Sequence, residues 1–479
     1  MPQIKFIFLL LFSLPLVSFG QDLTNSRGMR DKNSGFTKVV GENQDGIFVI
    51  HGKNSTLASG FHIERFQHDL AKSELYKVLI PKARLEKVIV KENSISYFTH
   101  EGKRFKGEKI LRFTSIASAN YQRLSMSAVK VSDYDFDQEY VSSHTSYDKS
   151  TTTFAVGVQK ERISGLRILQ VKQDGEFKEV ANFITEYKST EIDYLDVVND
   201  NYNNTFVLSR LKGNYFKAPQ YLLLLHNGAT GEVSQKKLND NKTWLSSVKM
   251  MFDNKNNITN VFSFFGERLN ENKGYMLLSF NGKNQEKKVS VFTEFEDSYK
   301  EEFLGLTAVY GGAQLNNFHI RGLRPKEDGG VIVVAEKFLK VDKTEMEFVN
   351  GVAQPLTRSV YNFDEVMVLS LNAEGEMKWS RKMNKKQNTM YDGGFYSSIQ
   401  VVFTEYNVHI LYNDKMNTSG NVMQYSIDLE GEVTEKLILK SISYYQYIIP
   451  MQGRQVGYNR VVIPATINKD TKLIKLTYN

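Results

Sequence analysis

Short apolar runs that alternate with polar residues recur along the whole chain, and each ends at a small group of Asn, Asp or Gly. This period of two is typical of β-strands with one buried face. The stretch "NAEGEMKW", which starts at Asn372, follows an apolar run from Val366 to Leu371 and leads into basic residues. Asn or acidic residues with Gly permit the left-handed backbone of a tight hairpin, so the pattern predicts two strands joined by a short turn.

The same arrangement is repeated, and each copy is preceded by two further strand candidates. Before Asn372, for example, these are "FHIRGLRP" and "GVIVVAEKF". Four antiparallel strands in units mostly about 50 to 60 residues apart are typical of propeller blades. The clearest copies of the hairpin run from Leu166 to Phe183, Tyr221 to Leu238, Tyr275 to Phe292, Val366 to Met383 and Val422 to Leu439.

The sequence therefore predicts an all-β fold, a β-propeller of four-stranded antiparallel blades that forms a single domain over residues 36–479. Eight units can be counted, and seven blades remain if the weakly patterned second unit, around "SISYFTHEG", is not a complete blade. The last unit ends with "KLIKLTY" and lacks an outer strand. Either this blade has three strands, or the N-terminal segment at residues 21–35 pairs with it and closes the ring.

Residues 1–20 have the parts of a secretory signal peptide: Lys5, an uncharged apolar run from Phe6 to Val17, and small residues before Gln21. The run is shorter than the roughly 20 residues of a bilayer span. No later segment reaches that length, so we expect no transmembrane segment in the mature chain. The chain has no cysteine, which favours export to a Gram-negative envelope, in the periplasm or associated with the outer membrane.

The formal charge is +7, and the mature chain carries +6 because the first 20 residues contain one Lys and no acidic residue. Basic and acidic residues alternate throughout instead of gathering on one arm, which argues against nucleic acid as a partner. The mild excess of positive charge is compatible with attraction to anionic envelope polymers.

Motifs for chemistry are sparse. There is no G-x-S-x-G, P-loop, G-x-G-x-x-G or H-E-x-x-H pattern. The acidic stretch "DYDFDQE" begins like a calcium loop at Asp133, but Gln138 stands where the loop needs Gly, and His144 where it needs Glu. We interpret it as a solvated connector and predict neither metal nor cofactor. The two carboxylates needed for glycoside cleavage can come from different blades. Their spacing along the sequence therefore does not show whether such a pair exists.

One region departs from the blade pattern and supplies the predicted binding site. The longest insertion, Phe338 to Asn362, is interpreted as a long loop, and the segment from Lys385 to Ser398 connects an outer strand to the next inner strand. Such a connector can reach the central channel. The alternative interpretation is solvated loop residues and aromatic packing between blades. The predicted binding residues are Glu336, Lys385, Lys386, Gln387, Tyr391, Asp392 and Tyr396.

The chain resembles the β-propeller repeat class and, more narrowly, exported propeller-like proteins of Bacteroidetes-type bacteria. The resemblance rests on the "FGQ" end of the leader, "GENQDGIFVIHG", "DGGVIVVAEKF" and "GEMKWSRKMNKKQNTMYDGG". It implies a fold and no transferable catalytic residue.

Two functions follow as hypotheses. The first is a non-enzymatic binding or scaffold protein of the bacterial cell envelope, with an envelope protein or polymer as partner. The second is a carbohydrate-active hydrolase or lyase with carboxylates around the channel. A quinoprotein-like dehydrogenase is disfavoured because such blades carry regular Trp, and this chain has only Trp244 and Trp379. The oligomeric state is not predicted.

Overall fold

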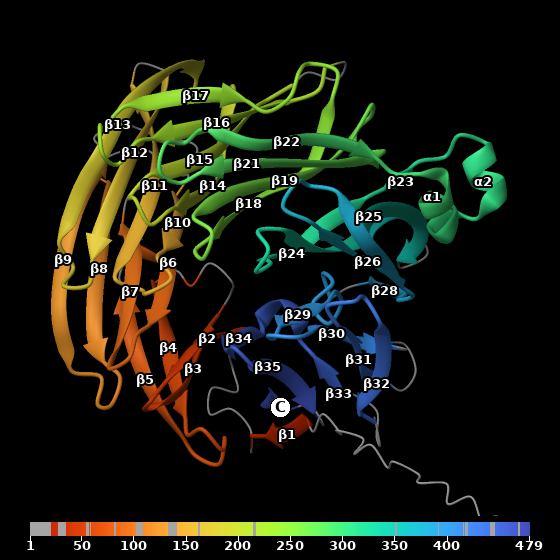
Figure 1. The fold of residues 1–479 in the computed structure, drawn as a ribbon. Helices are drawn as coiled ribbons and strands as arrows, with labels where there is room; N and C mark the ends of the chain where they lie inside the picture. The colour runs from red at the N-terminus through yellow and green to blue at the C-terminus, as the bar shows by residue number, and fades with distance from the viewer. Residues whose placement is uncertain are drawn as a thin grey trace, which may run out of the picture.

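The computed structural model describes residues 21–26, 35–53, 57, 59–80, 83–101, 109–132, 141–160, 163–213, 217–349, 352–390, 392–414, 416, 420–440, 446–467 and 470–479. Within these residues the chain forms eight antiparallel sheets of four or more strands, which follow one another in chain order around a ring (Figure 1). The predicted leader, residues 1–20, lies outside the described residues.

The first four sheets have their strands in sequence order from the inside of the ring outward. The first contains β2 (Phe36–Asn43), β3 (Gly46–Gly52), β4 (Ser59–Phe66) and β5 (Ser73–Ile80). The second contains β6 (Ala83–Val90), β7 (Ser94–Glu101), β8 (Lys109–Ala117) and β9 (Arg123–Ser132). The third contains β10 (Val141–Thr145), β11 (Thr151–Lys160), β12 (Ile163–Lys172) and β13 (Phe177–Lys188). The fourth contains β14 (Ile192–Asn199), β15 (Thr205–Leu211), β16 (Gln220–His226) and β17 (Val233–Lys237).

The next three sheets keep the same order. The fifth contains β18 (Trp244–Asp253), β19 (Ile258–Gly266), β21 (Gly274–Asn281) and β22 (Lys287–Glu294). The sixth contains β24 (Phe318–Pro325), β25 (Val331–Val349), β26 (Val352–Leu371) and β27 (Met377–Met383), with β28 (Gln387–Met390) added beside β26. The seventh contains β29 (Gln400–Phe403), β30 (Val408–Asp414), β31 (Asn421–Ile427) and β32 (Val433–Leu439).

The N-terminal strand completes the eighth sheet. β1 (Gln21–Asn25) pairs with β36 (Asp470–Tyr478), which pairs with β35 (Arg460–Ile467); β33 (Gln446–Ile448) and β34 (Arg454–Gly457) share the other edge of β35. Beyond β1, the Ser26 backbone N–H donates to the Leu473 carbonyl oxygen, and the Leu473 N–H donates to the Ser26 side-chain hydroxyl. The chain thus has the second arrangement that the sequence left open, in which the N-terminal segment supplies the missing outer strand.

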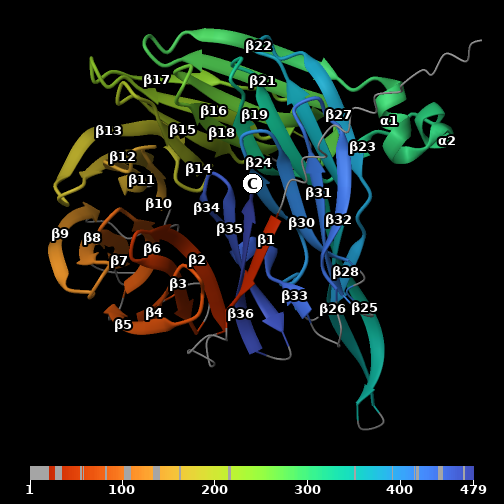
Figure 2. The ribbon, with the colours of Figure 1, turned by 60° about the horizontal axis from the view of Figure 1, so that its bottom comes forward.

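The buried apolar residues lie between consecutive sheets. Each of the eight hydrophobic clusters in the described part of the chain combines residues of two neighbouring sheets. The cluster that joins the last sheet to the first contains Val39, Ile47, Phe66, Val462 and Leu473. The ring is therefore closed by the same packing that joins every other pair, and the sheets of Figure 2 radiate around it. The eight-bladed propeller predicted from the sequence is confirmed, with the second unit a complete sheet.

In the third, sixth and seventh sheets, a Gly in the turn between the third and fourth strands lies against a side chain of the preceding sheet. Gly431 has φ +87°, and a Cβ there would lie 2.9 Å from the ring of Trp379 in the preceding sheet. The Trp379 indole donates to the carbonyl oxygen of Leu429 in the same turn at 2.9 Å. Gly in these turns thus permits both the left-handed backbone and the close approach of a neighbouring side chain.

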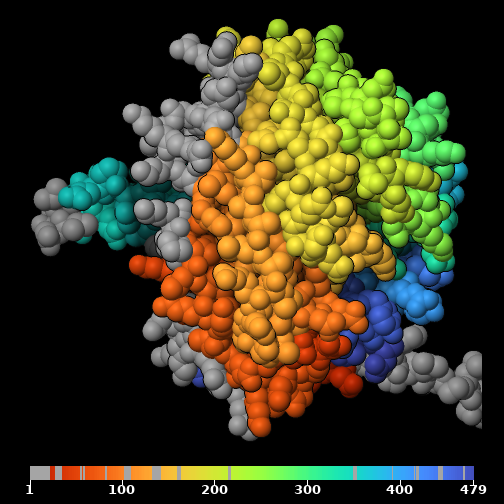
Figure 3. All heavy atoms as spheres, turned by 90° about the vertical axis from the view of Figure 1, so that its left-hand side faces the viewer, coloured from red at the N-terminus to blue at the C-terminus, as the bar shows by residue number. Residues whose placement is uncertain are grey.

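The prediction that Phe338 to Asn362 forms a loop is wrong. These residues continue β25 and β26 into one hairpin, paired from Phe338 opposite Phe363 to Val349 opposite Val352. The two strands pair with each other along this length, so the segment extends the sheet as an arm that projects from the body of the molecule (Figures 2 and 3).

Three further elements lie outside the blade pattern. The sequence did not predict the helices α1 (Asp297–Leu304) and α2 (Leu306–Tyr310), or the short pair β20 (Glu271–Asn272) and β23 (Leu315–Asn316), between the fifth and sixth sheets. A 3₁₀ turn, η1 (Pro450–Gln452), comes before β34. No helix in the described residues has the length and apolar character needed to cross a membrane.

Candidate anion-binding site

A cavity of about 670 Å³ lies among the inner strands where the ring closes. Its walls come from β2, β6, β10 and β34, together with the turn that follows β10. This volume is within the range of about 300 to 1,000 Å³ that is usual for small-molecule sites. The cavity therefore joins strands from both ends of the chain at one place.

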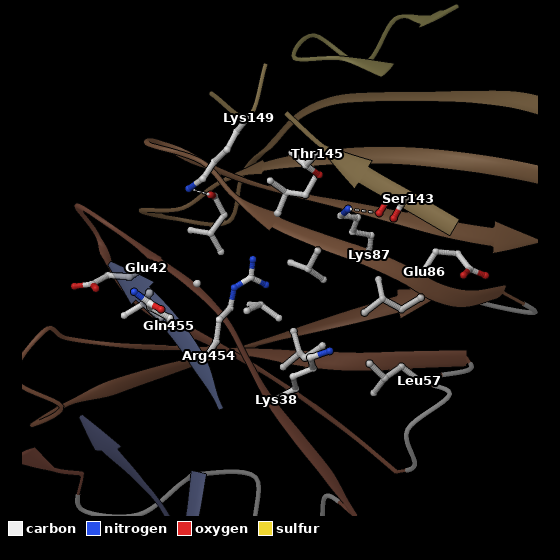
Figure 4. Close-up of a pocket in the computed structure, with 18 of the residues that line it drawn as sticks. Lys38, Glu42, Leu57, Glu86, Lys87, Ser143, Thr145, Lys149, Arg454 and Gln455 are labelled. Atoms are coloured by element: carbon white, nitrogen blue, oxygen red, sulfur yellow. Dashed lines mark hydrogen bonds between the residues drawn. The ribbon is translucent and has the colours of Figure 1, made fainter. Parts of the chain in front are cut away.

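Four cationic side chains line this cavity: Lys38 on β2, Lys87 on β6, Lys149 after β10, and Arg454 on β34. Figure 4 shows the Arg454 guanidinium pointing into the middle of the cavity, with Lys38 on one side and Lys87 and Lys149 on the other. Lys38, Lys149 and Arg454 keep a large part of their surface open to solvent although protein surrounds the cavity. We call these four residues the cation cluster.

Two members of the cation cluster are held in place by backbone carbonyl groups. The Lys87 ammonium donates to the carbonyl oxygen of Ser143 at 2.9 Å, and the Lys149 ammonium donates to that of Val90 at 2.8 Å. Both hydrogen bonds cross from the second sheet to the third (Figure 4). They orient the two ammonium groups but leave their charge uncompensated.

The two carboxylates in the cavity wall are engaged elsewhere. Glu42 pairs with Arg460 (Oε1–Nη1 3.0 Å) and with His68 (Oε1–Nδ1 2.7 Å). Glu86 pairs with Arg84 (Oε1–Nε 2.5 Å). In Figure 4 both carboxylates point away from the centre of the cavity.

Consequently, the described part of the chain offers the cation cluster no acidic counterpart at contact distance. Among the described residues, no carboxylate oxygen forms an ion pair within 4.0 Å with any of its four members. Unpaired cations that share one cavity repel each other, and an anion in the cavity would relieve that repulsion.

The pKa values reflect this mutual repulsion. Burial, and then the charge of Arg454, lower the pKa of Lys87 to about 8, and the carboxylate of Asp196 opposes the shift. Burial followed by Arg454 also lowers the pKa values of Lys38 and Lys149. Burial alone lowers the pKa of Arg454. Burial is the larger cause in each lysine, and Arg454 lies within electrostatic reach of all three.

Two inner strands that line the cavity have irregular pairing, and one of the irregularities directly precedes Lys87. The pairing of β2 with β3 shifts between Val39 and Gly41, and that of β6 with β7 shifts between Leu85 and Lys87. A β-bulge of this kind re-aims the side chains that follow it and is common next to functional sites. In β6 the shift comes immediately before Lys87.

A second, smaller cavity of about 320 Å³ adjoins the first. The two cavities share Ser146 and Tyr147 in the turn after β10. Its other walls are the turn after β14, which contains Asn199 and Asp200, and Asn254 in the turn after β18. The lining therefore changes from cationic in the first cavity to amide, hydroxyl and carboxylate groups in the second.

The structure brings three of the sequence-predicted binding residues together, but in the interior. The carboxylate of Glu336 is fully buried and pairs with Lys385 (Oε1–Nζ 2.9 Å) and Arg321 (Oε2–Nε 2.8 Å). Lys385 also donates to the side chain of Gln387 at 2.9 Å, and Gln387 donates to the backbone of Asn413 at 2.7 Å. This network joins the sixth sheet to the seventh, and burial lowers the pKa of Lys385.

The other predicted residues lie around this network. Lys386 is exposed, and the half-buried Asp392 accepts a hydrogen bond from the backbone N–H of Gly394. The Tyr396 hydroxyl is 3.1 Å from the Thr466 hydroxyl in the eighth sheet. Tyr391 lies outside the described residues. As a binding site this set stays a prediction.

The acidic stretch from Asp133 to Glu139 also lies outside the described residues. Within the residues that are described, no group of three or more His, Asp or Glu side chains is arranged to hold a metal ion.

Sequence reasoning missed the cation cluster entirely. Lys38 and Arg454 are more than 400 positions apart, and each is a single basic residue in an ordinary strand pattern. No motif in the sequence connects these residues, which come together only when the ring is closed.

Comparison with known proteins gives only distant likenesses, and the assignment of the fold rests on the sheets themselves. No family model matches the sequence, and no curated protein matches it. Similar solved structures include the WD40 domain of SCAP from fission yeast, which is 9% identical with a TM-score of 0.42 over 96% of this chain and 98% of that one. The β-propeller domain of Nup133 from Vanderwaltozyma polyspora is 9% identical, with a TM-score of 0.40 over 82% of this chain and 99% of that one.

The polysaccharide lyase Uly1 is 10% identical, with a TM-score of 0.40 over 82% of this chain and 89% of that one. At such low identity the likeness concerns the arrangement of strands alone. The sheet order and the clusters between sheets define the chain as a β-propeller.

Proposed function

We propose that this protein is a non-enzymatic binding propeller of the bacterial cell envelope and that its cation cluster holds an anionic ligand, such as part of an envelope polymer. The observation that carries the proposal is the convergence of Lys38, Lys87, Lys149 and Arg454 on one cavity without a carboxylate partner within 4.0 Å among the described residues. The envelope location is supported by the leader pattern at residues 1–20 and by the absence of cysteine.

Like charges held together in a folded protein repel each other and lower its stability unless a ligand of opposite charge is bound. Each ammonium or guanidinium group that meets an anionic oxygen forms a charge-assisted hydrogen bond, which contributes about 1.5 to 3 kcal/mol. The backbone carbonyl groups that hold Lys87 and Lys149 set these two ammonium groups in position before the ligand arrives. A preorganised site loses less entropy on binding.

The proposal is tested with a fluorescein-labelled decamer of L-glutamate, a polyanion without sugar, by fluorescence anisotropy. The Lys38→Gln/Arg454→Gln double variant is expected to bind about tenfold or more weakly than wild type. The control is Lys283→Gln/Lys288→Gln, which removes the same charge from two exposed lysines in the fifth sheet. Equal weakening by both double variants, or no binding by wild type, would overturn the proposal.

A second candidate function, a carbohydrate-active hydrolase or lyase, is favoured by one observation. Because the pKa of Lys87 is lowered to about 8, part of its population is a neutral amine at mildly basic pH and can accept a proton. Asp196 lies within electrostatic reach, and burial raises its pKa. The test is incubation with a panel of acidic polysaccharides. Release of reducing ends or unsaturated products by wild type, and its loss in Lys87→Met, would establish turnover. A stable complex without products would support the binding function instead.

A further inference from the structure

The two adjoining cavities differ in chemistry and share one turn. Lys149 belongs to the cation cluster, and only two residues before it Tyr147 lies on the border of both cavities with 86% of its surface exposed. An exposed aromatic ring at the mouth of a cavity offers an apolar face with a polar tip. The turn therefore presents a cationic group on one side and a flat stacking surface between the two cavities.

The second cavity contains an acceptor that the protein leaves unused. Asn199 is 92% buried, at 8% exposure, and its side-chain oxygen has no hydrogen-bond partner in the described part of the chain. A buried carbonyl oxygen without a partner is costly and unusual. Asn199 lines this cavity, but its oxygen is itself closed to solvent, so a ligand hydroxyl group donates to it once the side chain turns toward the cavity.

The neighbouring carboxylates are held by their own turns. Asp148 accepts hydrogen bonds from the Ser146 hydroxyl and from the backbone N–H of Ser150. Asp200 accepts them from the backbone N–H of Tyr202 and from the Asn204 side chain. These carboxylates are thereby fixed in the wall, where their remaining lone pairs can accept from hydroxyl groups but would repel an acidic group. The second cavity is thus suited to neutral, hydroxyl-rich chemistry.

We infer that the ligand is an acidic oligosaccharide that spans both cavities, with its acidic groups against the cation cluster and a neutral sugar face on Tyr147 and Asn199. This inference rests on the proposed function, because it names the class of anion held by the same cluster. An acidic sugar combines acidic groups and a hydroxyl-rich face in one chain, whereas a free phosphate fills only the first cavity. Carboxylate and sulfate groups share the required charge, so the experiment distinguishes them.

The test is isothermal titration calorimetry with three probes: tetragalacturonate, its fully methyl-esterified form, and a dextran sulfate oligosaccharide of similar length. We expect tetragalacturonate or the sulfated probe to bind, and the uncharged ester to bind at least tenfold more weakly. Tighter binding of the first probe assigns a uronate ligand, and tighter binding of the second assigns a sulfated one. Equal affinity for the ester would overturn the inference.

Variants separate this inference from the proposed function. Tyr147→Ala is expected to weaken binding of the acidic sugar about fivefold or more and to leave the affinity for the glutamate decamer unchanged. The control is Tyr310→Ala, because that ring is 82% exposed on α2. Asn199→Leu is a second variant that removes the unused acceptor, and its folding is checked by its melting temperature. If Tyr147→Ala changes neither ligand while Lys38→Gln/Arg454→Gln weakens both, the sugar inference fails and the anion site stands. If no acidic ligand binds, both fail.

Discussion

The Lys87 ammonium and the carbonyl oxygen of Ser143 are 2.9 Å apart, and this hydrogen bond spans the second and third sheets at the wall of the cation cluster. It holds a charged group at a site where burial and Arg454 both disfavour the charge. The protein thus keeps an electrostatically unfavourable ammonium group at a fixed position. Such groups are typical of functional sites. The following predictions examine that arrangement and the ring that produces it.

The first prediction concerns the coupling between Arg454 and Lys87. Arg454→Gln is expected to raise the pKa of Lys87 above about 8, because a nearby positive charge is removed. The measurement is the pH titration of ¹³C-methylated lysines by NMR, with Lys87→Arg used to assign the signal. An unchanged pKa in Arg454→Gln would show that burial alone causes the shift.

The second prediction concerns the pH dependence of anion binding. Below about pH 8 Lys87 is protonated and affinity should be constant; as the pH rises further the ammonium loses its proton and affinity should fall. A bound anion favours the charged form, so binding should take up protons above about pH 8. Calorimetry in buffers of different ionisation enthalpy measures this uptake. Lys87→Met should abolish it, and proton release in wild type would contradict the account.

The same group affects the stability of the unliganded protein. In the unfolded chain Lys87 keeps its proton up to its ordinary pKa of 10.5, whereas in the folded chain it releases the proton at about 8. The unfolded state binds more protons in this window, so Lys87 should make the folded state more stable as pH rises from about 8 to 10.5. Urea unfolding of wild type and Lys87→Met across this range gives the difference, and parallel curves for the two proteins would refute the assignment.

Ring closure supplies the fourth prediction. Leu473 is fully buried in the cluster that joins the last sheet to the first. Leu473→Ala should lower the free energy of unfolding by about 2 to 5 kcal/mol. The matched change Leu437→Ala, at a position that is 43% exposed on β32, should have an effect within about 0.5 kcal/mol. Similar losses in both variants would indicate that the closure does not stabilise the molecule in this way.

The fifth prediction distinguishes the two candidate sites. Lys385→Met leaves the buried carboxylate of Glu336 without one of its two cationic partners, which should cost about 3 to 5 kcal/mol of stability. Adding Glu336→Gln should recover part of this loss. Neither variant should change the affinity of the glutamate decamer, measured at a temperature where both are folded.

The exposed and half-buried members of the predicted set need a separate measurement. Lys386→Ala/Tyr396→Ala removes one exposed ammonium and one half-buried ring next to that network. If this double variant weakens anion binding as much as Lys38→Gln/Arg454→Gln does, the ligand lies at the junction of the sixth and seventh sheets. Unchanged binding would remove these two residues from the site.

The sequence predicted the blades well because their physics is local. The stretch "FHIRGLRP" is β24 at the residues expected, and "GVIVVAEKF" contains the start of β25. Alternation of buried and exposed positions determines a strand, and Gly with acidic residues determines the hairpin turn. The insertion after Phe338 was misread as a loop because neither face of its hairpin is consistently apolar, and the two strands pair with each other without packing on a core.

The site could not be predicted because its residues meet only through the closure of the ring. Arg454 reaches the cavity on β34, which contacts β2 once the last sheet packs against the first. Glu42 lies in the cavity wall but pairs with Arg460, which is far away in the sequence. The sequence alone does not show this pairing. A count of charges along the chain gives +7 and does not show which cations lack partners.

The most direct test of the account is a crystal structure of the protein with bound tetragalacturonate. We predict that carboxylate oxygens of the ligand lie within hydrogen-bond distance of Lys38, Lys87 and Arg454, inside the cavity between the inner strands. A ligand bound elsewhere, with the cation cluster occupied only by solvent, would contradict the assignment of this cavity as the binding site.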